Sequence, residues 1–417
     1  MSRPLMPNPN RPPIRDVFRR AWRRGRSILP EQGFHFARPL VLLQSDDWGR
    51  VGVRDAECWE HLRIAGVNLG ERPYDFYSLE TAGDVEAITS MLSRHHDSSG
   101  RPACLGMNFI LANVDFAKVS AGNFREIHLR PLTAGLPDGW YRPGLFEAYR
   151  SGISAGILSP ALHGLTHFCH PSTERYLRHD SDNAEERERA SLLRTLWNAG
   201  VPYIHWRMPW IGFEYSDPSQ PGKEQFLNSN VQEGLIETAV AAFKQFFSAA
   251  PRSACAPGYR ADFATHRAWA KHGIRVAQNG PGIPTPPHFH PNAEFNGPLH
   301  LYRTIDFEPA VAEGFSLDAC IKKAELSLAR GIPAIISVHS INFHSALKNF
   351  RSRTVKLLDE FLSALESKYP DLLYLRDEDL YDLVETGKFE SMQTAVRVSV
   401  TKQRFSAGLL AAAVGQS

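Results

Sequence analysis

The stretch 39-PLVLLQSDDWGRVG-52 joins an apolar run to a pair of adjacent acids. The run 40-LVLL-43 has the length and composition of a buried strand, and it ends in 44-QSDDWG-49. Asp46 and Asp47 therefore stand side by side at the end of that strand. Neighbouring carboxylates repel each other, and each costs free energy to remove from water. Some other interaction must offset this cost, unless the pair lies in water.

Short apolar runs alternate with helix-patterned stretches along the rest of the chain, which predicts parallel strands joined by helices. The expected strands are Leu40–Gln44, Cys104–Leu111, Ile157–His163, Pro202–Arg207, Arg275–Gln278, Leu299–Ile305, Ala334–His339 and Leu372–Leu375. The expected helices are Asp55–Gly66, Ala82–His95, Ala184–Ala199, Val231–Ala249, Asp262–His272, Leu317–Arg330 and Ser352–Lys368. No dinucleotide-type glycine fingerprint follows the first strand. We therefore predict an α/β fold, a distorted (β/α) barrel of seven to eight mostly parallel strands with long loop insertions, ahead of a doubly wound open sheet.

The composition predicts one large domain with two dissimilar ends. Hydrophobic residues make up 43% of the 417 residues, which is enough for a large core. The 47 Lys and Arg nearly balance the 45 Asp and Glu, so the global charge gives no sign of a specific nucleic-acid partner. We expect residues 1–34 to form a basic, flexible arm, residues 35–386 to form a barrel-shaped catalytic domain, and residues 387–417 to form a peripheral tail.

The expected arm is strongly basic at its start, since residues 1–26 hold eight arginines against the single acid Asp16. A disordered arm is one interpretation. The alternative is a short amphipathic helix over 17–28 that contacts an anionic membrane or another polyanion.

The cellular compartment follows from what the sequence lacks. No apolar segment reaches the roughly 18–20 residues that cross a bilayer, and no hydrophobic stretch of a secretory signal follows the basic residues. The five cysteines form no CxxC pair, which favours reduced thiols. We therefore expect a cytoplasmic protein, with at most peripheral contact to the inner face of the membrane.

A histidine pair follows a later predicted strand, in 161-ALHGLTHFCHP-171. His163 and His167 are four residues apart, a spacing that places both imidazoles on one face of a helical turn. Together with one aspartate they predict a three-ligand divalent site of catalytic type, with Zn²⁺ favoured over Co²⁺, Ni²⁺, Mn²⁺ or Fe²⁺. If Asp47 binds the cation, Asp46 can stay ionised beside it and act as a base.

Two further features supply candidate catalytic groups. His339 ends the predicted strand in 334-AIISVHSINFHS-345, which places it at the catalytic edge of a barrel, although a histidine there can also simply bond to the backbone. Arg207 and Arg260 each follow or precede a loop with proline and an aromatic residue. Either arginine can pair with an acid and hold its pKa down, or can form an ordinary structural salt bridge.

SDDWG, HGLTH and SVHS, in this order, resemble three motifs of the polysaccharide deacetylase (NodB homology) superfamily, and DDWGRVGV is similar to the DDFG opening of the YdjC-type deacetylases. The resemblance runs over about residues 40–383. It implies a metal-dependent hydrolase that removes an N-acyl group, usually N-acetyl, from a carbohydrate. The roles that it implies are general base for Asp46, metal ligands for Asp47, His163 and His167, and general acid for His339.

The sequence departs from the family at one motif. The family has an arginine before a proline and an aromatic residue, whereas 254-ACAPGYRAD-262 has Cys255 in that place. Arg260 or Arg207 would then have to support the base. The departure also leaves open a non-catalytic, carbohydrate-binding barrel of the same fold.

A glycoside hydrolase is the second alternative. That chemistry needs two carboxylates about 5–9.5 Å apart across the scissile bond. Asp46 and Asp47 cannot provide this separation, because adjacent side chains diverge. A distant acid such as Glu214 or Asp306 would be required.

Overall fold

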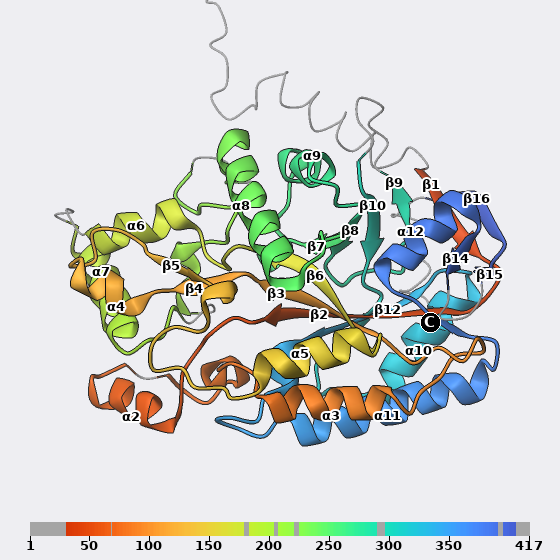
Figure 1. The fold of residues 1–417 in the computed structure, drawn as a ribbon, viewed down its shortest axis with the longest axis horizontal. Coiled ribbons are helices and arrows are strands. Elements are labelled where there is room, and N and C mark those ends of the chain that lie inside the picture. The colour runs from red at the N-terminus through yellow and green to blue at the C-terminus, as the bar shows by residue number, and fades with distance from the viewer. Residues whose placement is uncertain are drawn as a thin grey trace, which may run out of the picture.

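The computed structural model describes residues 31–405 except 68, 179–182, 204–206, 221–224, 290–296 and 391–394. A curled sheet runs through the middle of this described part (Figure 1). Its strands are β2 (Leu40–Trp48), β3 (Leu105–Ile110), β6 (Leu158–Gly164), β7 (Ser253–Cys255), β8 (Val276–Asn279), β9 (His288–Phe289), β10 (Leu299–Tyr302), β11 (Ile305–Asp306), β12 (Ala334–His339) and β13 (Leu373–Tyr374). Their order is β11-β12-β2-β3-β6-β7-β8-β10-β9, with β13 also pairing with β2.

One continuous segment, 299–306, closes this sheet into a barrel. Its first half, β10, pairs in parallel with β8, and its second half, β11, pairs in parallel with β12. Between them, Arg303 donates its backbone N–H to Asn279 and Thr304 donates its own to Ile335. The segment therefore links β8 on one side to β12 on the other, with β9 added beside β10. The predicted distorted barrel of mostly parallel strands is confirmed, and the two-residue β9 is the antiparallel exception.

The first strand is apolar throughout because both of its faces are covered. Leu40 and Leu42 pack inside the barrel with side chains of β8, β10 and β12. Val41 and Leu43 point the other way, into the larger core beneath the helices. This alternation carries Gln44 and then Asp46 into the barrel interior at the strand's carboxyl end.

The helices cover the outside of the barrel. They are α2 (Ala56–Ile64), α3 (Ala82–Leu92), α4 (Phe116–Ala121), α5 (Leu145–Ser154), α6 (His170–Arg178), α7 (Ala184–Asn198), α8 (Ser229–Phe247), α9 (Phe263–Lys271), α10 (Leu317–Ala329), α11 (Arg351–Lys368) and α12 (Asp377–Thr386). In Figure 1, α3, α5 and α11 lie on one side of the sheet, and α8 and α9 lie on the other. Local capping fixes several starts: Thr81 accepts a hydrogen bond from the backbone of Asp84 at the start of α3.

All seven predicted helices are present, whereas the strand prediction is wrong at Pro202–Arg207 and omits several short strands. Residues 202–203 are not in a strand, and 204–206 lie outside the described residues, so no strand is seen over the described part of Pro202–Arg207. The three-residue β7 was not predicted, because three residues carry no periodic signal.

The two ends of the described chain meet. β1 (Glu31–Phe36) pairs antiparallel with β16 (Val400–Phe405). Four further short strands lie outside the main sheet in the described structure: β4 (Ala112–Val114), β5 (Leu129–Pro131), β14 (Lys388–Glu390) and β15 (Ala395–Arg397). Parts of the predicted arm and tail are thus strands, while residues 1–30, including the predicted amphipathic helix, lie outside the described residues. No helix in the described ranges is both long enough and apolar enough to cross a membrane.

Candidate active site and metal centre

Asp46 lies at the carboxyl end of β2, opposite His339 of β12, and is almost fully buried. Arg303, in the segment that closes the barrel, is also buried and binds it with two hydrogen bonds. Nη1 donates to Oδ2 at 2.5 Å, and Nη2 donates to Oδ1 at 2.6 Å. Burial alone would raise the pKa of the Asp46 carboxyl, but the attraction of Arg303 outweighs it and holds that pKa well below its ordinary range. Asp46 is therefore an ionised carboxylate.

Polar side chains inside the barrel hold this ion pair in place. Asn108 Nδ2 donates to Asp46 Oδ1 at 2.7 Å. Gln278 Oε1 accepts from Asn108 at 2.7 Å and from Arg303 Nη2 at 3.0 Å. Every one of these groups is buried. Burying them costs little free energy only because each donor in the network has an acceptor.

Asp47 has an unusual backbone and different partners. Its φ is 73°, in the left-handed region that non-glycine residues avoid. Its carbonyl accepts hydrogen bonds from Tyr77 Oη at 2.7 Å and Ser340 Oγ at 3.3 Å, which hold this conformation. A strained residue of this kind costs about 1–3 kcal/mol and is found mainly at functional sites.

The Asp47 side chain meets the two predicted histidines. Oδ1 lies 3.1 Å from His167 Nε2 and 3.5 Å from His163 Nε2, and all three side chains are buried. These ligand atoms lie within 4.8 Å of one another. On its other side, Asp47 Oδ2 lies 3.4 Å from Arg50 Nη2. The structure thus brings together the three residues predicted as metal ligands.

The hydrogen bonds around this triad fit a metal. His163 Nδ1 lies 2.8 Å from the carbonyl oxygen of Cys255, which can only accept, so Nδ1 carries a proton and Nε2 is the atom that faces Asp47. His167 Nδ1 is bonded to Tyr203 Oη at 2.6 Å, and burial lowers the pKa of His167 to about 3, which keeps the ring neutral. Asp47 Oδ1 is buried and accepts no hydrogen bond within the described structure. An ionised oxygen facing two imidazole nitrogens without a proton donor is the environment that a divalent cation satisfies.

His163 and His167 lie close together as predicted, but the reason is not a shared helical turn. His163 is the next-to-last residue of β6 and His167 lies in a turn after the strand, so the two are not on a helix. Glu214 fixes the turn: its Oε1 accepts from the backbone N–H groups of Leu165 at 2.8 Å and Thr166 at 2.9 Å. Burial raises the pKa of Glu214 to about 8.

His339 faces Asp46 from the neighbouring strand, with Nε2 3.8 Å from Asp46 Oδ2. Its Nδ1 lies 2.6 Å from Glu308 Oε1, and the other oxygen of Glu308 accepts from Asn342. Burial alone would lower the pKa of His339, but the Glu308 carboxylate outweighs it and raises that pKa to about 9. His339 is therefore protonated at neutral pH.

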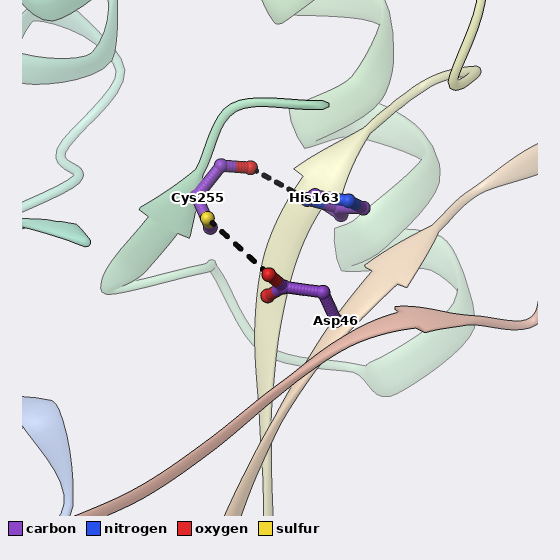
Figure 2. A group of neighbouring side chains, drawn as sticks. All are labelled: Asp46, His163 and Cys255. Carbon is purple, nitrogen blue, oxygen red and sulfur yellow. Dashed lines mark hydrogen bonds between the residues drawn. The ribbon is translucent and has the colours of Figure 1, made fainter. Parts of the chain in front are cut away.

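Cys255 lies where the resembled family has its arginine. Figure 2 shows its carbonyl bonded to His163 and its thiol pointing to Asp46, with Sγ 3.9 Å from Oδ2. Asp46, His163 and Cys255 are also close enough to share a metal. However, Asp46 is already bound by Arg303, and burial raises the pKa of the Cys255 thiol, which opposes a thiolate ligand. The group around Asp47 is the better candidate.

The arginine beside Asp46 is neither of the two predicted ones. Arg260 is exposed, and Arg207 donates to the carbonyl of Leu69 and lies 3.5 Å from Asp75. Arg303 was not predicted as a site residue although the sequence carries a signal, since it is the one Lys, Arg, Asp or Glu in the mostly apolar run 299-LHLYRTI-305. A buried arginine needs an acid partner, and that requirement alone could have directed attention to it.

Comparisons with known proteins give similarity in structure only. No family model matches the sequence, and the search of curated proteins finds no match.

Across most of its length the chain is similar in structure to polysaccharide deacetylases. A protein from Mycobacterium smegmatis, provisionally assigned as a polysaccharide deacetylase, shares 12% identity and a TM-score of 0.42 over 84% of this chain and 91% of that chain. A family 4 carbohydrate esterase from Streptomyces lividans, in complex with acetate, shares 10% and 0.32 over 82% and 93%. The 4-alpha-glucanotransferase from Thermococcus litoralis shares 10% and 0.43 over 82% and 40%. At these values the function has to be argued from the side chains.

Proposed function

We propose that this protein is a metal-dependent hydrolase that removes an N-acyl group, N-acetyl in the first instance, from a carbohydrate. One observation carries the proposal: Asp47 Oδ1 is buried, accepts no hydrogen bond in the described structure, and faces the Nε2 atoms of His163 and His167. The resemblance of the motifs around these residues to those of polysaccharide deacetylases supports the same reaction.

Asp47, His163 and His167 would hold the cation. Two nitrogens and one oxygen suit Zn²⁺ best, with Co²⁺, Ni²⁺, Mn²⁺ and Fe²⁺ as alternatives. When bound, such a cation supplies Lewis acidity, which polarises a carbonyl group and acidifies water at neutral pH.

The chain's own residues supply the proton transfers. Asp46 is ionised and its Oδ2 accepts a proton from the attacking water, while Arg303 keeps the carboxylate in position. His339 is protonated and gives its Nε2 proton to the departing amine, because an amide nitrogen leaves poorly unless it is protonated. Glu308 orients the imidazole through Nδ1 and favours its charged form. General acid–base help of this kind is worth roughly 10²–10⁴ in rate.

The alternatives have less support. A glycoside hydrolase would need Glu214 or Asp306 as its second acid, yet Glu214 is bound to two backbone amides and Asp306 is exposed on β11. A non-catalytic barrel would not require a protonated His339 and an ionised Asp46 held 3.8 Å apart.

Two measurements test the proposal. Elemental analysis of the purified protein should find about one divalent metal per chain, and acetate should be released from at least one N-acetylated sugar in a panel. Asp46→Asn should abolish release with metal content unchanged. If Asp46→Asn loses the metal instead, the two acids have been assigned in the wrong order, and if no variant or condition shows metal, the proposal is wrong.

We also propose, on the sequence alone, a cytoplasmic location with peripheral contact between residues 1–34 and an anionic membrane or polyanion. Sedimentation with vesicles of anionic and of neutral lipid tests the proposed membrane contact. Removal of residues 1–30 should abolish any preference for the anionic vesicles. Equal binding by the shortened chain would refute it.

A further inference from the structure

Arg50 is a second buried cation beside the site, and neither proton transfer uses it. It follows the SDDWG motif, is 7% exposed, and lies with its guanidinium carbon 4.1 Å from the ring centre of Tyr77 and 5.7 Å from that of Tyr203. Nη1 donates to Tyr203 Oη at 3.0 Å, and Nη2 lies 3.4 Å from Asp47 Oδ2. The guanidinium therefore packs between two aromatic rings, and one of its edges contacts Asp47, a proposed metal ligand.

The hydrogen bonds of Arg50 are incomplete. A guanidinium carries five N–H donors in a fixed planar fork. Its Nε is buried and has no hydrogen-bond partner among the described residues. A buried donor without an acceptor is costly, so a residue kept in this state is expected to complete its bonding with a ligand or water.

A hollow in the surface reaches this cation. It is lined by Arg50 and residues 51–53, by Tyr74, Tyr77 and Tyr203, and by Val201 and Pro202. The hollow opens to solvent and its cavity volume is about 20 Å³, so any group that enters it must be small, such as a single substituent of a sugar ring. Because Arg50 contacts Asp47 and Tyr203 contacts His167, the hollow borders the proposed metal ligands.

The charges beside the hollow favour an anion. Each carboxylate at the reacting centre already has its own cationic partner: Arg303 for Asp46, Arg50 for Asp47, and His339 for Glu308. A divalent cation on Asp47 therefore adds two positive charges with no carboxylate left to balance them. A negative group on the substrate would balance part of that charge.

We propose that the hollow at Arg50 is a subsite for a carboxylate on the sugar, so that the preferred substrate is an N-acylated acidic sugar of the N-acetylhexosaminuronic type and not a neutral N-acetylhexosamine. The fork of Arg50 matches a carboxylate in shape, and the tyrosines supply hydroxyl groups and ring faces for the sugar. This inference rests on the proposed function for its reaction, but the binding of the carboxylate does not depend on turnover.

Equilibrium binding tests the subsite independently of catalysis. Glucuronate and glucose are titrated into the purified protein by calorimetry, with wild type, Arg50→Gln and Arg54→Gln compared. Arg54 is the matched control, since it lies on the same segment, pairs with Asp55 and is not among the residues that line the hollow. Wild type and Arg54→Gln should bind glucuronate at least about tenfold more tightly than glucose, and Arg50→Gln should lose that preference.

Kinetics then test specificity. The kcat/KM for acetate release from an N-acetylhexosaminuronic acid should exceed that from the neutral sugar by about tenfold or more, and Arg50→Gln should remove the difference. Metal content is measured on each variant, because Arg50 also contacts Asp47. If Arg50→Gln does not fold, Arg50→Lys keeps the charge without the fork and should retain an intermediate preference.

The opposing outcomes are distinct. Equal binding of glucuronate and glucose by the wild type, or a preference that survives in Arg50→Gln, overturns the subsite. A loss of metal in Arg50→Gln with the carboxylate preference intact assigns Arg50 to Asp47 alone and also overturns it. Absence of acetate release from every sugar, with the glucuronate preference present and sensitive to Arg50, instead refutes the proposed reaction and leaves the subsite standing.

Discussion

Replacing Glu308 by glutamine should move the alkaline limit of activity. Burial alone would lower the pKa of His339, but the carboxylates around it, Glu308 above all and then Asp46 and Asp47, raise that pKa to about 9. The ordinary value is 6.5, so the difference is about 2.5 units, or roughly 3 kcal/mol in favour of the protonated ring. In Glu308→Gln the burial remains and the negative charge is gone. The pKa of His339 should then fall to about 6.5 or below.

The sign of the effect on activity follows from the role of His339 as the acid. Because the protonated form gives up the proton, activity is full below the pKa of His339 and is lost as the pH rises through it. Wild type should therefore remain active to about pH 9, whereas Glu308→Gln should lose activity above about pH 6.5. At pH 8 the variant should retain only a few per cent of the wild-type kcat/KM.

The assay is kcat/KM for acetate release between pH 5 and pH 10, together with titration of the His339 ring by NMR in the metal-free protein. Asp306→Asn is the matched control, since Asp306 is an exposed acid two residues away on β11. Glu308→Gln should also cost about 1–3 kcal/mol of unfolding free energy, because its amide would face the Asn342 donor. An alkaline limit that stays near pH 9 in Glu308→Gln, or that shifts equally in Asp306→Asn, would falsify the pairing of Glu308 with a catalytic acid.

Three further outcomes follow from the site. Asp47→Ala should remove the metal, seen by elemental analysis, and a variant that keeps about one metal per chain would contradict Asp47 as a ligand. Arg303→Met should lower the unfolding free energy in urea by about 3–5 kcal/mol, because Asp46 is left buried and unpaired, and a cost below about 1 kcal/mol would mean that water already screens the pair. Glu214→Ala should weaken metal binding about 10–100-fold in a chelator competition, since the turn that carries His167 loses its acceptor, whereas unchanged affinity would show that the turn is rigid without it.

The parts of the site that could be predicted are those with local signals. β2 and β12 were expected because each is a continuous apolar run, and a barrel places Asp46 and His339 together once the strands are known. The metal triad was predicted from a spacing that was interpreted as helical, although a turn held by Glu214 produces it.

Two partners of the catalytic pair were missed because the contacts that they make are not local in the sequence. Arg303 sits inside an expected strand, and nothing in its neighbours tells that this strand crosses from β8 to β12. Glu308 follows a two-residue strand that pairs with β12, so its contact with His339 exists only once the barrel has closed. Arg207 and Arg260 were chosen by their proximity to proline-aromatic loops, which is a weaker criterion than the need of a buried charge for a partner.

The segment 299–306 has a consequence for how the chain is made. Asp46 and Arg303 are 257 residues apart, and a ribosome adds about 5–20 residues per second, so Asp46 emerges roughly 13–50 seconds before its counter-charge exists. During that interval the nascent β2 cannot bury its carboxyl end without stranding a charge. The carboxyl end of β2 is therefore expected to stay hydrated until Arg303 has been made. Synthesis of Arg303 therefore both completes the site and allows the carboxyl end of β2 to be buried.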